Sequence, residues 1–153
     1  MKKLGILLIA IQVSFLLSAQ VEVSQDEGIF AYESGALYSG KVESKYTSGN
    51  VSSSYEIENG IYHGVASFYY ENGNAQELGS FFMGKKDGRW IRWSEKGTKT
   101  AEANYSKGKK DGKWTIWDER GIKRYEMYYV NGVKTGTWIM WDEKGQIANQ
   151  KKY

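Results

Sequence analysis

The residue types that most often carry enzyme chemistry are sparse in this chain. His63 is the only histidine, and the sequence contains no cysteine. A nucleophilic serine or cysteine needs a base that a third residue holds in place, and one isolated histidine does not supply that arrangement. His63 precedes Gly64, and later stretches carry Asp87 and Asp111 at the equivalent point, which favours a turn role. We therefore expect a protein that is not an enzyme.

Four aspartates recur along the second half of the chain: Asp87, Asp111, Asp118 and Asp142. A hydrolase pair needs two carboxylates at a defined separation in a cleft. These aspartates instead recur with the repeat in turn-forming stretches, where aspartate is common, so solvated turn carboxylates are the simpler interpretation. No metal-ligand spacing and no glycine-rich phosphate loop are present, and thiolate ligands are excluded. We expect neither a metal nor a cofactor.

Aromatic and basic residues are better suited to binding than to catalysis. The six tryptophans form two periodic series: Trp90, Trp114 and Trp138, and Trp93, Trp117 and Trp141. Exposed aromatic patches mark contact sites, although packing of the rings on one another is an equal alternative. A basic stripe is predicted from Lys85, Lys86, Arg89, Lys109, Lys110 and Lys113. Such a stripe either meets phosphate-bearing lipid or is a solvated turn surface.

An unbroken 24-residue period sets the positions of these residues. Three series of glycines repeat in phase: 40, 64, 88, 112 and 136; 49, 73, 97, 121 and 145; and 60, 84, 108 and 132. Internal periods of this length indicate a repeat architecture. The repeats are expected at 40–63, 64–87, 88–111, 112–135 and 136–153, after an N-terminal cap strand region at 20–39.

The stretches between glycines are short and rich in aromatic and β-branched residues, which favours strands. Turn-forming pairs such as Asn131-Gly132 separate them. The sequence therefore predicts an all-β fold: one elongated antiparallel meander of tandem β-hairpins with about ten strands. Counting the leading glycine of each repeat as position one, positions three and six point to opposite faces. Lys151 and Lys152 then lie on an edge strand, where lysine discourages further pairing.

The first 19 residues have the layout of a secretory signal peptide. A basic start, Lys2-Lys3, precedes a mostly apolar run from 4 to 17 and the small residues Ser18 and Ala19. A retained membrane anchor is the alternative, although the run is short for a span. We therefore expect an exported protein that is periplasmic, outer-membrane associated or secreted. Export argues against a nucleic-acid partner.

Charge is distributed unevenly along the chain. Residues 20–80 hold nine acidic and two basic residues, whereas residues 81–153 hold nine acidic and seventeen basic residues. A linear array of repeats would thus be acidic at one end and basic at the other. This gradient permits weak head-to-tail self-association, which should depend on salt.

Three strings carry a resemblance to a known family. They begin at Gly88, Gly112 and Gly136, and each has the form Gly-x-Trp-x-x-Trp-x-x-x-Gly. They resemble the MORN-repeat variant family, whose pattern is Gly-x-Trp-x-x-Tyr-x-x-x-Gly and which includes YwqK-type antitoxin-like repeat proteins. The resemblance covers residues 28–153. It implies a β-hairpin array that works by contact, as a protein-interaction or membrane-proximal module, with toxin neutralisation as the activity of the antitoxin members.

These observations favour an exported, non-catalytic repeat scaffold that binds another protein, with an antitoxin- or immunity-like role as one form of it. The alternative is a cell-envelope protein that contacts glycan or anionic lipid through an exposed tryptophan ladder and the basic C-terminal half. Both alternatives place the contact on the last three repeats, because they hold all six tryptophans.

Overall fold

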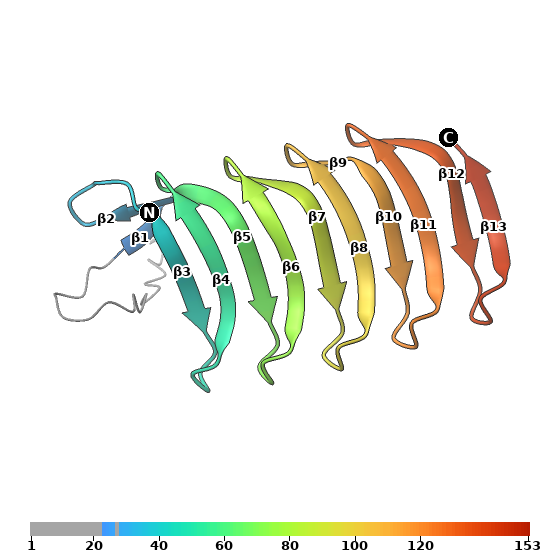
Figure 1. Ribbon diagram of the computed structural model, residues 1–153, viewed down its shortest axis with the longest axis horizontal. Coiled ribbons are helices and arrows are strands. Elements are labelled where there is room, and N and C mark those ends of the chain that lie inside the picture. Colours follow the sequence, from blue (N-terminus) through green and yellow to red (C-terminus); the bar gives the residue numbers. More distant parts are fainter. Residues whose placement is uncertain (1–22, 27) are drawn as a thin grey trace, which may run out of the picture.

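The computed structural model describes residues 23–26 and 28–153, and every element in that part of the chain is a β-strand. The expected signal peptide lies outside the described residues. The main sheet is antiparallel, has eleven strands and follows the order of the chain, which confirms the predicted meander (Figure 1). The strands are β1 (Val23–Asp26), β2 (Ile29–Tyr32), β3 (Gly40–Lys45), β4 (Val51–Glu58), β5 (Ile61–Tyr69), β6 (Ala75–Phe82), β7 (Lys85–Trp93), β8 (Lys99–Ser106), β9 (Lys109–Lys110), β10 (Gly112–Trp117), β11 (Lys123–Val130), β12 (Val133–Trp141) and β13 (Ile147–Lys152).

Two-residue turns join the hairpins along one long edge of the sheet, here called the tight-turn edge. Both residues of each turn have positive φ, as at Asn131 (51°) and Gly132 (86°). Those angles define a type I′ turn, whose twist matches that of the flanking strands. The four turns are Asn59-Gly60, Met83-Gly84, Lys107-Gly108 and Asn131-Gly132. They also connect the repeats, because the N–H of Gly108 donates to the carbonyl of Lys86 at 2.8 Å and that of Gly132 to Lys110 at 2.8 Å.

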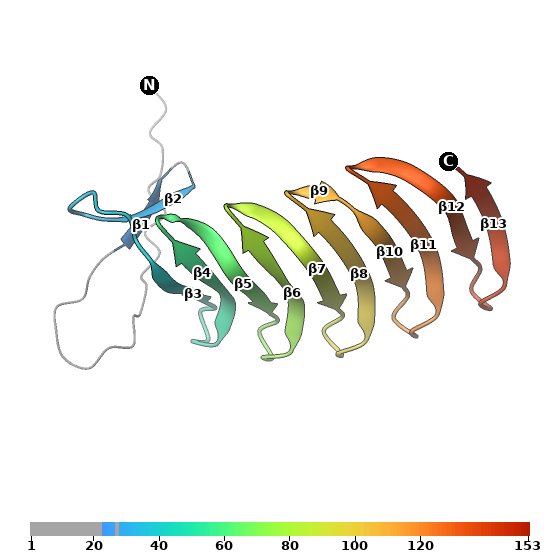
Figure 2. The ribbon, with the colours of Figure 1, turned by 45° about the horizontal axis from the view of Figure 1, so that its top comes forward.

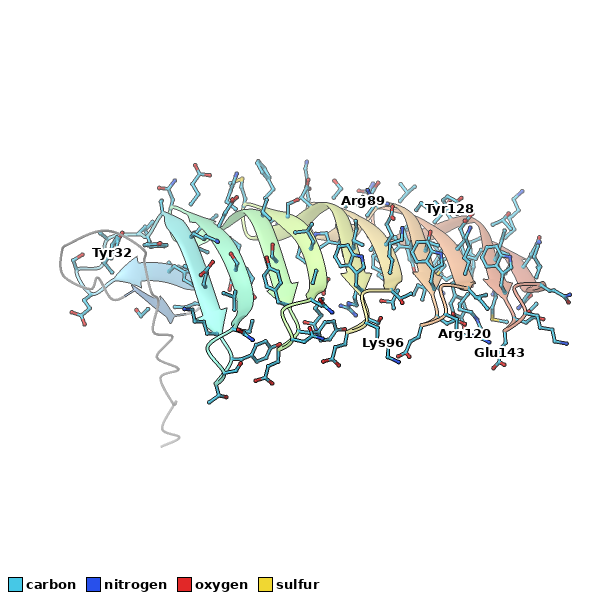
Figure 3. The ribbon with its side chains drawn as sticks, turned by 60° about the horizontal axis from the view of Figure 1, so that its bottom comes forward. Tyr32, Arg89, Lys96, Arg120, Tyr128 and Glu143 are labelled. Carbon is cyan, nitrogen blue, oxygen red and sulfur yellow. The ribbon has the colours of Figure 1, made fainter. Side chains whose placement is uncertain are left out.

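Wider turns lie along the opposite edge and close with the second glycine series. In the turn after β10, the N–H of Asp118 donates to the carbonyl of Ile122 at 2.9 Å and the N–H of Gly121 to the carbonyl of Asp118 at 2.9 Å. Figure 3 shows Lys96, Arg120 and Glu143 along this edge. Side chains link neighbouring turns, as where Arg120 donates to the carbonyl of Glu143 at 3.1 Å. Three of the wide turns are linked in this way to the next one along the array, through Asn50, Asn74 and Arg120.

The two tryptophan series lie on opposite faces of the sheet, as the alternation of side chains along a strand predicts. Trp114 contacts the ring of Tyr129 on one face, whereas Trp117 lies beside Lys113 and Thr115 on the other. We call the face with Trp90, Trp114 and Trp138 the packed face and the face with Trp93, Trp117 and Trp141 the open face. A register shift precedes Trp93, Trp117 and Trp141 in their strands.

The packed face holds the core of the molecule. Trp90 is 2% exposed because it lies between two small residues, Gly79 on β6 and Ala103 on β8. Ring contacts continue from strand to strand, with Tyr105 between Trp90 (6.3 Å between centroids) and Trp114 (5.1 Å). Edge-to-face pairs of this kind stabilise beyond the area that they bury. Among the described residues, the main sheet thus obtains a core from one face without a second layer.

The N-terminal cap differs from the expected strand. Residues 20–39 are predicted to add a cap strand, but β1 and β2 form a separate two-stranded sheet across the end of the main one (Figures 1 and 2). Phe30 enters a buried cluster with Tyr38, Val42 and Ile57, and its N–H donates to the carbonyl of Gly60 at 2.8 Å. This end of the sheet is therefore covered, while β13 lies at the opposite end.

Candidate binding surfaces on the two faces of the sheet

The three tryptophans of the packed face share one hydrogen bond. Each indole Nε1 donates to the carbonyl of the residue ten positions earlier: Trp90 to Ser80 at 3.1 Å, Trp114 to Asn104 at 2.9 Å and Trp138 to Tyr128 at 3.0 Å. A buried indole N–H usually needs such a partner. These three side chains therefore have a structural task, whatever else they contact.

A lysine lies over each of these indoles. The Nζ atoms of Lys86, Lys110 and Lys134 are 3.6, 4.2 and 4.6 Å from the ring centroids of Trp90, Trp114 and Trp138. The attraction of an ammonium group to an aromatic face holds each lysine against its ring. Trp90 is buried, whereas Trp114 and Trp138 are half-buried. The packed face consequently presents rings and positive charge together toward its C-terminal end.

On the open face, tryptophans and lysines alternate across neighbouring strands. Lys99 is the cross-strand partner of Trp93, and its Nζ lies 4.3 Å from the ring of Trp117. Lys123 is the partner of Trp117, and its Nζ lies 5.0 Å from the ring of Trp141. We call this series the tryptophan–lysine row: Trp93, Lys99, Trp117, Lys123 and Trp141. All three of its tryptophans are half-buried, so each indole keeps some exposed surface.

Two glutamates anchor the lysines of the row. Glu102 accepts from Arg89 at 2.8 Å and from Lys99 at 2.9 Å. Glu126, one period later, is 2.9 Å from Lys113 and 3.0 Å from Lys123. The hydrogen bond from Lys113 is the main cause that lowers the pKa of Glu126 from 4.5 to about 2, and that from Arg89 lowers the pKa of Glu102. Both glutamates are thus charged near neutral pH, and each is outnumbered by two cations.

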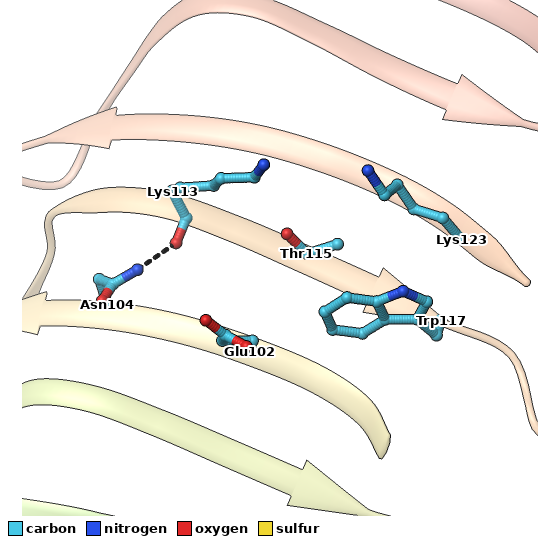
Figure 4. Close-up of a pocket in the computed structure, with 6 residues that line it drawn as sticks. All are labelled: Glu102, Asn104, Lys113, Thr115, Trp117 and Lys123. Atoms are coloured by element: carbon cyan, nitrogen blue, oxygen red, sulfur yellow. Dashed lines mark hydrogen bonds between the residues drawn. The ribbon is translucent and has the colours of Figure 1, made fainter. Parts of the chain in front are cut away.

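A shallow depression of about 310 Å³ opens beside Trp117 in the middle of the row (Figure 4). Its remaining lining is polar: Glu102, Asn104, Lys113, Thr115 and Lys123. Asn104 donates to the carbonyl of Lys113 at 2.6 Å, which fixes the amide at the rim. The depression therefore joins one flat apolar ring to both donors and acceptors of hydrogen bonds. Such a lining suits a ligand that has an apolar face and many polar groups.

Comparison with known proteins agrees with the repeat pattern. A family model described as the MORN repeat variant matches residues 62–82 and 110–131. The chain carries MORN-variant repeats. A comparison with curated proteins finds no match. Among solved structures, the chain aligns with one from the "Crystal structure of GtfA/B complex bound to UDP and GlcNAc", at 11% identity and a TM-score of 0.29; the match covers 91% of this chain and 25% of that one.

The six residues of the predicted basic stripe are divided among three places in the MORN-variant array. Lys86 and Lys110 cover indoles on the packed face, and Arg89 and Lys113 pair with glutamates on the open face. Lys85 and Lys109 follow the tight turns and are exposed. The six side chains therefore do not form one continuous surface.

The predicted turn position before each leading glycine links neighbouring repeats. Asp87 accepts from the N–H of Lys107 at 2.9 Å, and Asp111 accepts from that of Asn131 at 2.9 Å. His63, at the same position, instead pairs with Glu58 at 3.2 Å and packs on the ring of Phe82. Asp118 and Asp142, in the wide turns, each accept two backbone N–H groups of their own turn. No group of three or more metal-binding side chains occurs among the described residues, and no helix long enough to cross a membrane occurs there.

Sequence reasoning missed four residues of the open face. Glu102 and Glu126 are one period apart, as are Lys99 and Lys123, so the repeat itself holds the signal. The lysines fall opposite position-six tryptophans in the hairpin register. An alignment of each repeat's second strand against its first would have found them.

Proposed function

We propose that this chain is an exported, non-catalytic repeat scaffold that acts by binding another protein. The observation that carries the proposal is the C-terminal part of the packed face, where Trp114 and Trp138 remain half-exposed beneath Lys110 and Lys134. Partly exposed aromatic rings are typical of the residues that dominate binding energy at protein interfaces. The equivalent Trp90 is 2% exposed, so the contact surface begins after it.

The chemistry of this surface points to an acidic partner. Lysines that lie over indole rings offer positive charge and apolar area at the same place. A carboxylate beside an apolar side chain on the partner would meet both, and charge complementarity would speed association. An immunity-like role, in which the partner is a toxin, is one form of this function.

Export supports a partner in the cell envelope or outside the cell. The basic start and the apolar run from 4 to 17 motivate this part of the proposal, and they lie outside the described residues. A fusion of residues 1–25 to a reporter that is active only after export tests it. Reporter activity is expected, and a fusion that stays inactive in the cytoplasm would contradict export.

The protein contact is tested with matched charge reversals. Lys110→Glu with Lys134→Glu changes the packed face, whereas Lys85→Glu with Lys109→Glu makes the same charge change at the tight turns. Capture from an envelope extract should recover one partner with the unaltered chain and the turn variant and lose it with the packed-face variant. Equal capture by both variants would contradict the assigned surface.

Contact with an envelope glycan or anionic lipid is the second candidate function. The alternation of rings and cations in the tryptophan–lysine row favours a glycan. The tight-turn edge favours lipid, because Met83 is 62% exposed and Val133 68% exposed beside exposed lysines. Flotation with anionic vesicles tests the lipid form. Binding that weakens with salt supports it, and an absence of binding at low salt contradicts it.

A further inference from the structure

We infer that the tryptophan–lysine row of the open face is a binding strip for an extended acidic polysaccharide, with its centre at Trp117. The inference rests on the second candidate function, contact with an envelope glycan, and names the ligand class and the residues. It concerns the face opposite to the one proposed for a protein partner.

The spacing of the row is the first observation. Trp93, Trp117 and Trp141 end β7, β10 and β12, which are two strands apart in the sheet. Two strands correspond to roughly 10 Å. This distance is comparable to the length of a disaccharide, so a linear chain of pyranose rings could place an apolar ring face on each indole in turn.

The charge between the rings is the second observation. Lys99 lies between Trp93 and Trp117, and Lys123 lies between Trp117 and Trp141. Sugar acids carry a carboxylate at the edge of the ring, next to the face that would stack. The polymer would thus meet a ring and a cation alternately, in the order that the row presents them. Pairing with Glu102 and Glu126 holds the lysines in place but leaves each cluster with excess positive charge.

The depression beside Trp117 is the third observation. Asn104, Thr115 and Lys113 carry hydrogen-bonding groups and line the depression together with Trp117. Sugar hydroxyls both donate and accept, and the depression lines one side of the indole with both kinds of group. The position one repeat earlier replaces this lining with Ser80, Arg89 and Ile91, so the polar set is complete only at Trp117.

The N-terminal repeats provide a matched comparison within the same chain. Tyr69 occupies position six of the second repeat and borders a depression of about 330 Å³. Ala75 is its cross-strand partner, where the third and fourth repeats have Lys99 and Lys123, and the one charged residue of the lining, Glu43, is paired with Lys41 at 2.6 Å. An acidic polymer should therefore avoid Tyr69, although the surface there is of similar size.

Titration calorimetry of the full chain without its first 19 residues tests the inference with three probes. They are oligogalacturonate, a neutral cello-oligosaccharide of equal length, and polyglutamate of equal charge. Oligogalacturonate should bind and should shift tryptophan fluorescence, and the other two should bind at least about tenfold more weakly. Equal binding of polyglutamate would show that charge alone acts, and equal binding of the neutral probe would remove the acid requirement. Either result, or no binding of oligogalacturonate, overturns the inference.

Variants locate the contact. Trp117→Ala should weaken oligogalacturonate binding at least about tenfold, as for a central aromatic contact, while Tyr69→Ala should leave it unchanged. Lys99→Gln with Lys123→Gln keeps every aromatic ring and should reduce both the affinity for oligogalacturonate and the salt dependence of that affinity. This variant tests the inference even if Trp117→Ala does not fold. Unchanged affinity in the lysine variant would overturn the inference that the tryptophan–lysine row binds the polymer. Partner capture by Trp117→Ala should persist, so failure of the saccharide site is distinguishable from failure of the protein contact.

Discussion

Gly79 lies beneath the indole of Trp90, and a side chain at residue 79 would overlap the ring. The glycine is required here by space and not by backbone conformation, since Gly79 is absent from the residues with positive φ. Gly79→Ala should therefore lower the free energy of unfolding by roughly 1–3 kcal/mol through overpacking. Urea denaturation of the single variants and of the double variant with Trp90→Val measures this. The penalty should shrink in the double variant; a penalty of the same size there would contradict the contact.

Acid should destabilise the fold in part through Glu126. Pairing with Lys113 lowers its pKa from 4.5 to about 2 in the folded chain. A depressed carboxyl pKa contributes stability that is complete above the ordinary value and is lost as the pH falls through the folded value. Glu126→Gln should consequently lower the midpoint of denaturation at pH 7 and make the fall between pH 4.5 and 2 shallower. Glu119→Gln, in an exposed turn, is the control and should leave the profile unchanged.

Two of the tight turns hold a residue that is ill suited to its backbone. Met83 and Lys107 have φ of 48° and 49°, where the equivalent positions hold Asn59 and Asn131. Asparagine tolerates this left-handed conformation better than a side chain with an unbranched apolar stem. Met83→Asn should raise the free energy of unfolding by about 0.5–1 kcal/mol, because little packing is lost at a residue that is 62% exposed. Met83→Leu should give no gain, and a gain of equal size there would refute the backbone argument.

The aspartate that joins two tight turns can be tested by exchange. Asp111 accepts from the N–H of Asn131 at 2.9 Å, and Ser39 performs the same task for Asn59 at 2.9 Å. Asp111→Ala should lower the free energy of unfolding by about 1 kcal/mol and speed hydrogen exchange at the Asn131 amide. Asp111→Ser should retain much of the protection, because a hydroxyl replaces the carboxylate. Protection that is unchanged in the alanine variant would argue against the link.

The sequence alone predicts most of this fold, because the glycines and rings recur at one interval and the strands between them alternate faces. Trp114 and Trp117 are three residues apart on one strand, and this separation alone assigns them to opposite faces. A cap at 20–39 is predicted, but its two-stranded form could not be, since β1 and β2 lie outside the repeat and pair with each other. The surfaces on which the individual basic side chains lie could not be predicted either. Lys86 and Lys85 are adjacent in sequence, yet one covers an indole and the other lies exposed at the tight-turn edge.

The candidate site is likewise only partly predictable from the sequence. The tryptophans are visible as a pattern, but the cations between them come from the neighbouring strand, and their places depend on the register of each hairpin. Lys99 is six residues after Trp93 and eighteen before Trp117, and it lies between the two. Separations of that kind are periodic yet not local, so the order of residues along the chain does not bring them together.

The hydrogen bonds that link one repeat to the next recur at constant offsets, as from Trp90 to Ser80 and from Trp138 to Tyr128. A gene that lost or duplicated 24 codons inside the array would encode a chain in which nearly every such donor again finds an acceptor of the same kind. A change of any other length would break the phase of every contact that crosses the junction. Selection can therefore lengthen or shorten this protein in whole repeats, and vary its surface one repeat at a time, without changing how the core packs.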